Sequence, residues 1–204
     1  FVGFNLKPER LILVGDPKQL SSTVTSPFCT TAGFDVSLFV RLYQMRSRKR
    51  TGSIFHMLDT QYRMHPHILE FPNNMYYEGL LKTAETVLTR KNDNFGFPPF
   101  SFVDIDGNER RNSSYHGSYE NEAEARAIVS ILSTKFRRSQ KVLILTFYSA
   151  QQGLIASLLR EHNRPMTTVT TVDSSQGYYS YSYLFLSLLS FDKIGTVPIA
   201  VECK

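Results

Sequence analysis

The 204-residue sequence contains only two cysteines, Cys29 and Cys203. Two thiols cannot complete a zinc site by themselves, and they cannot build the framework of several disulfides that stabilises small secreted domains. This low cysteine content favours a reducing compartment, so we expect the protein to lie in the cytoplasm or the nucleus.

The sequence also lacks a long hydrophobic run and a strong charge of one sign. A membrane-spanning helix needs about 20 consecutive apolar residues, and the apolar stretch YLFLSLL at residues 183–189 is far shorter. We therefore expect no membrane association. The net charge of +5 is modest. It is compatible with contact to a polyanion but does not require one.

Patterns of strands and helices alternate along the chain. Continuous apolar runs and β-branched runs predict strands at residues 11–14, 100–106, 141–147, 167–173 and 181–189. Apolar residues at helical spacing predict helices at residues 35–43, 65–80, 119–136 and 149–162, the second of them broken at Pro72. Strands that alternate with helices in this way are typical of an α/β fold with a parallel sheet flanked by helices.

Two of these helices carry more detailed predictions. Asp35 or Ser37 is a candidate N-cap for the first helix, because short polar side chains accept hydrogen bonds from the first free N–H groups. In the helix at 119–136, acidic residues occupy the first turn, where they complement the helix dipole. Its apolar face should consist of Ala125, Ile128, Val129 and Leu132.

Polar clusters follow three of the predicted strands. They are GDPKQL at residues 15–20, TFYSAQ at residues 146–151 and TVDSSQG at residues 171–177. In open α/β sheets, ligands bind beyond the carboxyl ends of the strands. A chain that needed only a core would more often place simple turn residues there, so the three clusters indicate one shared site.

Three motifs resemble those of superfamily-1 helicases. They are VGDPKQL at residues 14–20, QYRMHP at residues 61–66 and TVDSSQG at residues 171–177. The most similar branch contains the nonsense-mediated-decay helicase and senataxin (the DNA2/NAM7 type), and the resemblance covers roughly residues 10–177. It implies a RecA-like P-loop NTPase fold, with the end of a first lobe at residues 1–55 and most of a second lobe at residues 56–204.

The resemblance assigns nucleotide contacts to five residues. Gln19 would sense the γ-phosphate and orient the attacking water, and Asp16 would tie its turn to the lobe interface. Arg63 would neutralise charge on the γ-phosphate, and Tyr62 would stack on the adenine. Gly177 would allow close backbone approach. The alternative for the first motif is a tight Gly-Asp-Pro turn with no ligand.

The resemblance also implies contacts with a nucleic-acid strand. Tyrosine at a strand end can stack on a base, or it can pack on its own sheet. Hydroxyl groups can donate hydrogen bonds to phosphates, and a carboxylate can brace the loop between them. The residues assigned to these contacts are Thr146, Tyr148, Gln151, Thr171, Asp173 and Ser174.

The sequence departs from the family pattern in several places. Relatives have a glutamate where Tyr179 stands and an aspartate where Tyr181 stands, and the last arginine-bearing motif is not found here. The sequence has no G-x-x-x-x-G-K-[ST] phosphate loop and no metal-binding DEA strand. We therefore expect this chain alone to be inactive, with ATP and Mg²⁺ bound only by a longer parent protein; a start at Phe1 also indicates a piece of one.

Two further features have ordinary alternatives. His65 and His67 are expected to make polar contacts at a helix start rather than to bind metal, since they do not share a helical face. The basic run at residues 46–50 is a candidate nucleic-acid contact or a solvated loop between lobes.

The sequence thus predicts part of an ATP-dependent helicase that moves along single-stranded RNA or DNA. The alternative is a degenerate helicase-like module that binds nucleic acid or protein without ATP turnover. Tyr179 and the missing last motif favour the alternative, whereas the intact QYRMHP motif and Gln19 favour the enzyme.

Overall fold

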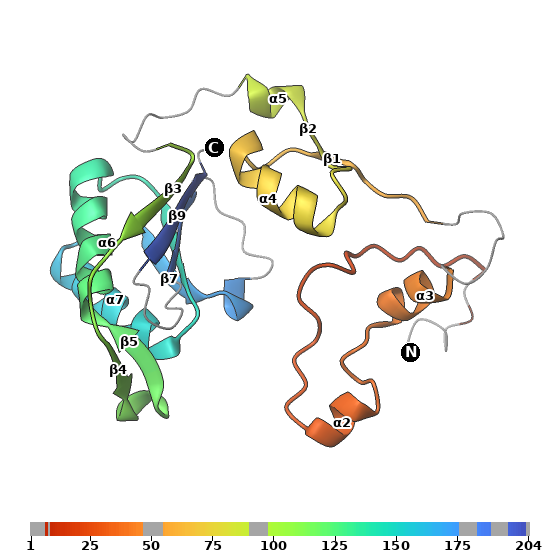
Figure 1. Ribbon diagram of the computed structural model, residues 1–204, viewed down its shortest axis with the longest axis horizontal. Helices are drawn as coiled ribbons and strands as arrows, with labels where there is room; N and C mark the ends of the chain where they lie inside the picture. The colour runs from red at the N-terminus through yellow and green to blue at the C-terminus, as the bar shows by residue number, and fades with distance from the viewer. Residues whose placement is uncertain are drawn as a thin grey trace. The chain divides into compact units, whose positions relative to one another are not determined.

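The computed structural model describes residues 7, 9–46, 55–89, 98–175, 183–188 and 196–202 (Figure 1). The chain divides into two compact units, Phe1–Leu58 and Asp59–Lys204. Among the described residues, no helix combines the length and the apolar character that a membrane crossing requires.

The first unit contains two short helices, α2 (Pro27–Thr31) and α3 (Leu38–Arg46). Helix α3 begins and ends three residues later than the predicted helix at 35–43. Of the two candidate N-caps, Ser37 caps the helix. Its Oγ accepts a hydrogen bond from the backbone N–H of Val40 at 3.2 Å. The α3 side chains Phe39 and Tyr43 both meet the ring of Phe55 edge-on.

The strand predicted at residues 11–14 is not observed. The segment has no regular secondary structure, and its apolar side chains are exposed, with Ile12 at 86% and Val14 at 88%. A buried parallel strand requires neighbouring strands for its backbone hydrogen bonds. The described residues of the first unit form no strand, so none of them offers this apolar run a strand to pair with.

The second unit is built on a five-stranded sheet. Its strands are β3 (Phe100–Asp104), β6 (Val142–Thr146), β7 (Thr167–Thr171), β8 (Tyr183–Leu188) and β9 (Thr196–Glu202). They lie in the order β3-β9-β8-β6-β7. Strand β6 pairs in parallel with both β7 and β8, which agrees with the predicted α/β fold and its parallel sheet.

Strand β9 makes the sheet mixed rather than purely parallel. It pairs antiparallel with β8 on one side and with β3 on the other, and sequence analysis did not predict it. Residues 189–195 separate β8 from β9. A parallel crossover requires about a dozen residues or more, so a connection of this length returns the chain in the antiparallel direction.

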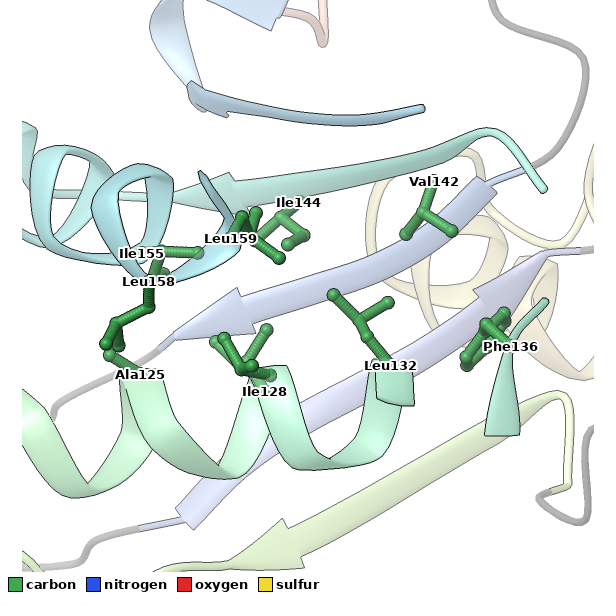
Figure 2. Close-up of a cluster of buried hydrophobic side chains, with 10 residues drawn as sticks. Ala125, Ile128, Leu132, Phe136, Val142, Ile144, Ile155, Leu158 and Leu159 are labelled. Atoms are coloured by element: carbon green, nitrogen blue, oxygen red, sulfur yellow. The ribbon is translucent and has the colours of Figure 1, made fainter. Parts of the chain in front are cut away.

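Helices α6 (Glu122–Lys135) and α7 (Ser149–Glu161) pack against one face of the sheet. Figure 2 shows their apolar side chains gathered with Val142 and Ile144 of β6. All four residues predicted for the apolar face of the first of these helices are buried. The alternate β6 residues Leu143 and Leu145 are buried in a separate cluster, as the two-residue period of a strand requires.

A hairpin that the sequence analysis missed precedes α6. Its strands are β4 (Glu109–Asn112) and β5 (Ser118–Asn121), which pair antiparallel. Residues 119–121, predicted as helix, are therefore strand. Helix α6 begins at Glu122 because the Asn121 side chain accepts hydrogen bonds from the N–H groups of Ala123 and Glu124, at 3.1 and 3.3 Å.

A smaller part of the second unit contains β1 (Thr60–Gln61), α4 (Pro66–Tyr76), β2 (Lys82–Thr83) and α5 (Glu85–Leu88). Helix α4 runs through Pro72, so the predicted break is wrong. A proline removes one hydrogen bond to the carbonyl four residues earlier. The helix continues to Tyr76 because its end is held, with the N–H groups of Tyr77 and Gly79 both donating to the carbonyl of Asn73.

Arg164 fastens the carboxyl end of α6. It is only 8% exposed, and its guanidinium donates hydrogen bonds to the carbonyl oxygens of Leu132 at 2.6 Å and Phe136 at 2.8 Å. Burial lowers the pKa of this guanidinium, and the charge of Arg138 lowers it further. These bonds supply charged donors to two carbonyls at the helix end, where regular helical partners run out; the Leu132 carbonyl also accepts the N–H of Phe136 at 3.2 Å.

Replacing Arg164 with methionine should therefore destabilise the chain. Methionine keeps a long apolar stem but has no donor, so the carbonyls of Leu132 and Phe136 would each lose a hydrogen bond from a charged donor. We expect the free energy of unfolding to fall by roughly 2 to 4 kcal/mol. Chemical denaturation followed by circular dichroism measures this, with Arg160→Met as the control, because Arg160 is exposed in the last turn of α7. Equal stability of the two variants would contradict this role.

Candidate functional site

In the first unit, the Asp16 carboxylate organises the GDPKQ turn. Its Oδ1 accepts a hydrogen bond from the backbone N–H of Lys18 at 2.9 Å, and its Oδ2 accepts one from Nε2 of Gln19 at 2.9 Å. A Cβ at Gly15 would lie 3.3 Å from the ring of Phe39, so the turn packs closely on α3. Asp16 thus fixes the direction of the Gln19 amide, which lies exposed at the surface.

In the second unit, the side chain of Gln61 holds the turn of the QYRMHP motif. Its Oε1 accepts hydrogen bonds from the backbone N–H groups of Arg63 at 2.8 Å and Met64 at 2.6 Å. Its Nε2 donates to the carbonyl oxygen of Met64 at 2.6 Å and to Oγ1 of Thr83 at 3.1 Å. Sequence analysis did not single out Gln61, although an amide before a turn is the signal that could have identified it.

This turn presents Tyr62 and Arg63 on the surface of the second unit. The Tyr62 side chain is 64% exposed, and Arg63 is also exposed. The guanidinium is therefore not held in the interior of its own unit. A guanidinium presents five N–H donors in a planar fork, and that geometry suits phosphate oxygens.

The two histidines of the motif begin helix α4. The Nδ1 atom of His65 accepts a hydrogen bond from the backbone N–H of His67 at 3.2 Å, so this ring caps the helix, with Pro66 as the first helical residue. Partial burial lowers the pKa of His65, and the charge of His67 lowers it further. A lowered pKa suits the neutral ring that this accepted hydrogen bond requires.

Two further contacts hold together the segments on either side of the QYRMHP turn. The Asn73 side chain exchanges two hydrogen bonds with the backbone of Leu81, at 2.9 and 3.0 Å, and this brings the chain back to β2 beside β1. Asp59 and Lys82 then form an exposed ion pair at 2.6 Å. This hydrogen bond lowers the pKa of Asp59 and raises that of Lys82.

The predicted nucleic-acid contacts lie at the carboxyl ends of two adjacent strands. Strands β6 and β7 end together, with Thr146 opposite Thr171 in their parallel register. The structure therefore brings these two predicted clusters side by side. Gly177, predicted from the same loop as a nucleotide contact, lies outside the described residues, as do Tyr179, Tyr181 and residues 47–50 of the basic run.

These residues differ in how accessible they are. Asp173 and Ser174 are exposed, and Tyr148 and Thr171 are half-buried. The Thr171 hydroxyl donates a hydrogen bond to Ser174 Oγ at 3.0 Å and accepts one from the N–H of Ser174 at 3.3 Å. Thr146 is fully buried, and its Oγ1 accepts a hydrogen bond from the N–H of Tyr148 at 3.2 Å.

Gln151 is occupied within the framework of the second unit. It is 2% exposed. Its Oε1 accepts a hydrogen bond from the backbone N–H of Asn121 at 2.7 Å, and its Nε2 donates to the carbonyl of Asn121 at 3.0 Å. Both ends of the amide therefore bind the end of β5, and in this arrangement they fasten the hairpin to α7.

Near the hydrogen bonds between Gln151 and Asn121 lies a buried carboxyl group that sequence analysis missed. Glu124 is 2% exposed, and its Oε1 has no hydrogen-bond partner. It lines a pocket with room for about one water molecule, together with Glu109, Glu120, Tyr119, Tyr148 and others. Burial raises the pKa of Glu124 to about 7, and the nearby charge of Glu109 adds to this effect, while a hydrogen bond from Asn121 opposes it.

Comparison with known proteins finds a family model and several curated proteins that match this chain. A family model described as an AAA domain matches residues 34–188. The chain is 35% identical over 182 residues to the probable helicase senataxin of Homo sapiens, covering 82% of this chain and 7% of senataxin. It is 30% identical over 184 residues to the probable helicase MAGATAMA 3 of Arabidopsis thaliana, covering 83% of this chain and 22% of that protein.

A yeast protein shows a similar match. The chain is 30% identical over 194 residues to the ATP-dependent helicase NAM7 of Saccharomyces cerevisiae, covering 88% of this chain and 19% of NAM7. The chain thus spans less than a quarter of the length of each of these three curated relatives.

Replacing Gln61 with methionine should loosen the turn that carries Arg63. The variant keeps the length of the side chain but loses all four hydrogen bonds. We expect the amide hydrogens of Arg63 and Met64 to exchange with solvent about tenfold faster, as measured by hydrogen exchange. Gln44→Met, at an exposed position of α3, is the control and should leave both amides unchanged. Unchanged exchange in the Gln61 variant would mean that this amide does not hold the turn.

Replacing Glu124 with glutamine should stabilise the protein at alkaline pH. The folded-state pKa is raised from 4.5 to about 7, so the unfolded chain ionises first as pH increases. The stability contributed by the neutral carboxyl group is therefore complete below 4.5 and is lost as pH rises through 7. At about pH 8 we expect the variant to be more stable than the wild type by roughly 1 to 3 kcal/mol.

The measurement is the free energy of unfolding at about pH 5 and about pH 8. Glu122→Gln is the matched control on the same helix. Its carboxylate is exposed and bonded to Arg126, and that hydrogen bond lowers its pKa from 4.5. It therefore stays ionised throughout this pH range, and Glu122→Gln should keep the pH dependence of the wild type. An identical pH dependence in the wild type and the Glu124 variant would show that Glu124 ionises normally in the folded protein.

Proposed function

Because the chain belongs to the AAA-domain family of the senataxin and NAM7 type of superfamily-1 helicase, we propose that it is part of an ATP-dependent enzyme that moves along single-stranded RNA or DNA. In this proposal, residues 1–55 belong to the end of a first RecA-like lobe. Residues 56–204 form most of a second RecA-like lobe, and the parallel strands β8, β6 and β7 described above support this.

The observation that carries the proposal is the surface position of Arg63 on a turn held by four hydrogen bonds. Phosphoryl transfer is catalysed mainly by positioning and by neutralising charge on the transferred group. A guanidinium can neutralise that charge only if it is accessible to the nucleotide and its orientation is fixed. We assign Arg63 to the γ-phosphate and Tyr62 to stacking on the base of the nucleotide.

Gln19 is the second residue that we assign to the γ-phosphate. Its amide is held by Asp16 at 2.9 Å, so its direction is fixed before a nucleotide binds, and it orients the attacking water. An amide N–H is a donor that suits a phosphate oxygen. When bound, ATP supplies the phosphoryl group that is transferred.

We place the ligands of Mg²⁺ in a part of the parent protein outside this chain. Among the described residues, no group of three or more His, Cys, Asp or Glu side chains could hold a metal ion. The sequence of the chain also lacks the phosphate loop. Arg63 and Gln19 therefore act only in the parent protein, and the chain by itself does not hydrolyse ATP.

We assign the nucleic-acid strand to the shared ends of β6 and β7. The Ser174 hydroxyl lies exposed there and can donate a hydrogen bond to a phosphate, and Thr171 orients that hydroxyl by donating to its oxygen. The ring of Tyr148 can stack on a base. Asp173 braces the loop between them. Thr146 and Gln151 belong to the same region, but their polar atoms bind the protein backbone, so their part is to shape the site.

Replacing Arg63 with alanine in the full-length protein should abolish ATP turnover. An arginine that neutralises charge in phosphoryl transfer contributes about 10³-fold or more to kcat. Steady-state ATPase assays with and without single-stranded RNA measure the loss, and binding of the RNA should be unchanged. Arg126→Ala, which removes an exposed arginine of α6, is the control and should retain full turnover.

Two outcomes would change the proposal. Comparable turnover in the wild type and Arg63→Ala would refute the assignment of Arg63. A wild-type protein that binds RNA but shows no ATPase activity under any condition would instead favour the degenerate helicase-like module, which the substitution at Tyr179 already suggests on sequence grounds.

A further inference from the structure

Three side chains form a continuous row on the β4–β5 hairpin and the adjacent end of β6. Arg111 and Tyr119 are directly opposite each other in the hairpin register, and the guanidinium carbon of Arg111 lies 5.4 Å from the ring centroid of Tyr119. The ring of Tyr119 in turn meets the ring of Tyr148, with centroids 5.5 Å apart and planes inclined by 64°. The row therefore continues directly from the strand end that we assign to nucleic acid.

The charges on the two faces of the hairpin are arranged differently. Glu120 binds Arg110 at 2.7 Å and Asn112 at 2.8 Å, so the positive charge of Arg110 is balanced within the hairpin. The ion pairs formed by the described residues do not include Arg111. Its guanidinium is exposed and rests on an aromatic ring, so it keeps its donors toward solvent.

The hairpin is fixed to the rest of the second unit. Gln151 binds both backbone groups of Asn121, and Ser118 Oγ accepts a hydrogen bond from the N–H of Ala150 at 3.3 Å. Tyr119 lies between these two anchored residues and is still 36% exposed. A ring that is exposed but held in place loses little conformational entropy when a ligand stacks on it.

We propose that Arg111 and Tyr119 extend the strand-binding surface by one nucleotide, with Tyr119 stacking on a base and Arg111 contacting the adjoining phosphate. The inference rests on the proposed function, because it places the strand at Tyr148. A planar base beside an anionic phosphate matches an aromatic ring beside a guanidinium. An acidic peptide would use the guanidinium but would leave the ring without a stacking partner.

The first test measures binding of fluorescein-labelled oligouridylate and oligothymidylate to the full-length protein by fluorescence anisotropy. Tyr119→Leu should weaken binding about tenfold, which is the cost of losing one base stack, whereas Tyr119→Phe should bind within about twofold of the wild type. Arg111→Gln should weaken binding and reduce the dependence of log Kd on log salt by about one. Arg126→Gln is the control and should not change binding.

The second test locates the contact directly. Oligonucleotides that carry 5-iodouridine are photo-crosslinked to the protein, and the crosslinked residues are mapped by mass spectrometry. A crosslink to Tyr119 supports the inference even if Tyr119→Leu disturbs its neighbour Tyr148. Crosslinks confined to Tyr148 and residues 171–175 would overturn the inference but leave the proposed function intact.

Three other results decide against one or both claims. If Tyr119→Leu and Tyr119→Phe bind like the wild type, or lose affinity equally, then Tyr119 does not stack on a base. If Arg111→Gln keeps the full salt dependence of the wild type, then Arg111 does not contact a phosphate. No crosslink to any residue of the second unit would contradict both the inference and the assignment of the strand to the ends of β6 and β7.

Discussion

The proposed chemistry depends on one side-chain amide, that of Gln61. A turn that projects two consecutive large side chains leaves its own backbone groups without regular partners, and unpaired groups are costly. Gln61 supplies acceptors for two N–H groups and a donor for a carbonyl within the same turn. Glutamate has no donor and a hydroxyl side chain is too short, so the amide is the group that suits this position. Tyr62 and Arg63 can then remain exposed.

The same use of amides recurs elsewhere in the second unit. Asn73 binds both backbone groups of Leu81, and Gln151 binds both backbone groups of Asn121. Each amide joins two segments that neither a helix nor a sheet connects. This explains why a conspicuous polar residue after a strand, such as Gln151, can belong to the framework although the sequence suggests a ligand contact. The accessible residues of the strand-end cluster are Thr171, Ser174, Asp173 and Tyr148.

The hydrophobic patterns of single segments were enough to predict the elements whose formation depends on one buried face. The continuous apolar run of β6 and the helical spacing of α6 were sufficient, because each pattern reflects one buried face. The β4–β5 hairpin and β9 were missed, and the run at residues 11–14 was wrongly predicted as a strand, because strand formation depends on pairing with distant segments. Similarly, the motifs identified Arg63 as a candidate, but only the structure shows that Gln61 orients it and that Glu124 is buried.

The central claim is that Arg63 reaches the γ-phosphate of a nucleotide bound by the parent protein. The most direct measurement is a structure of the full-length protein with Mg²⁺ and a non-hydrolysable ATP analogue. The account predicts a guanidinium nitrogen of Arg63 at hydrogen-bond distance, about 3 Å, from a γ-phosphate oxygen, with the Gln61 amide still bonded to the turn. An Arg63 side chain directed away from the nucleotide, with another residue contacting the γ-phosphate, would contradict it.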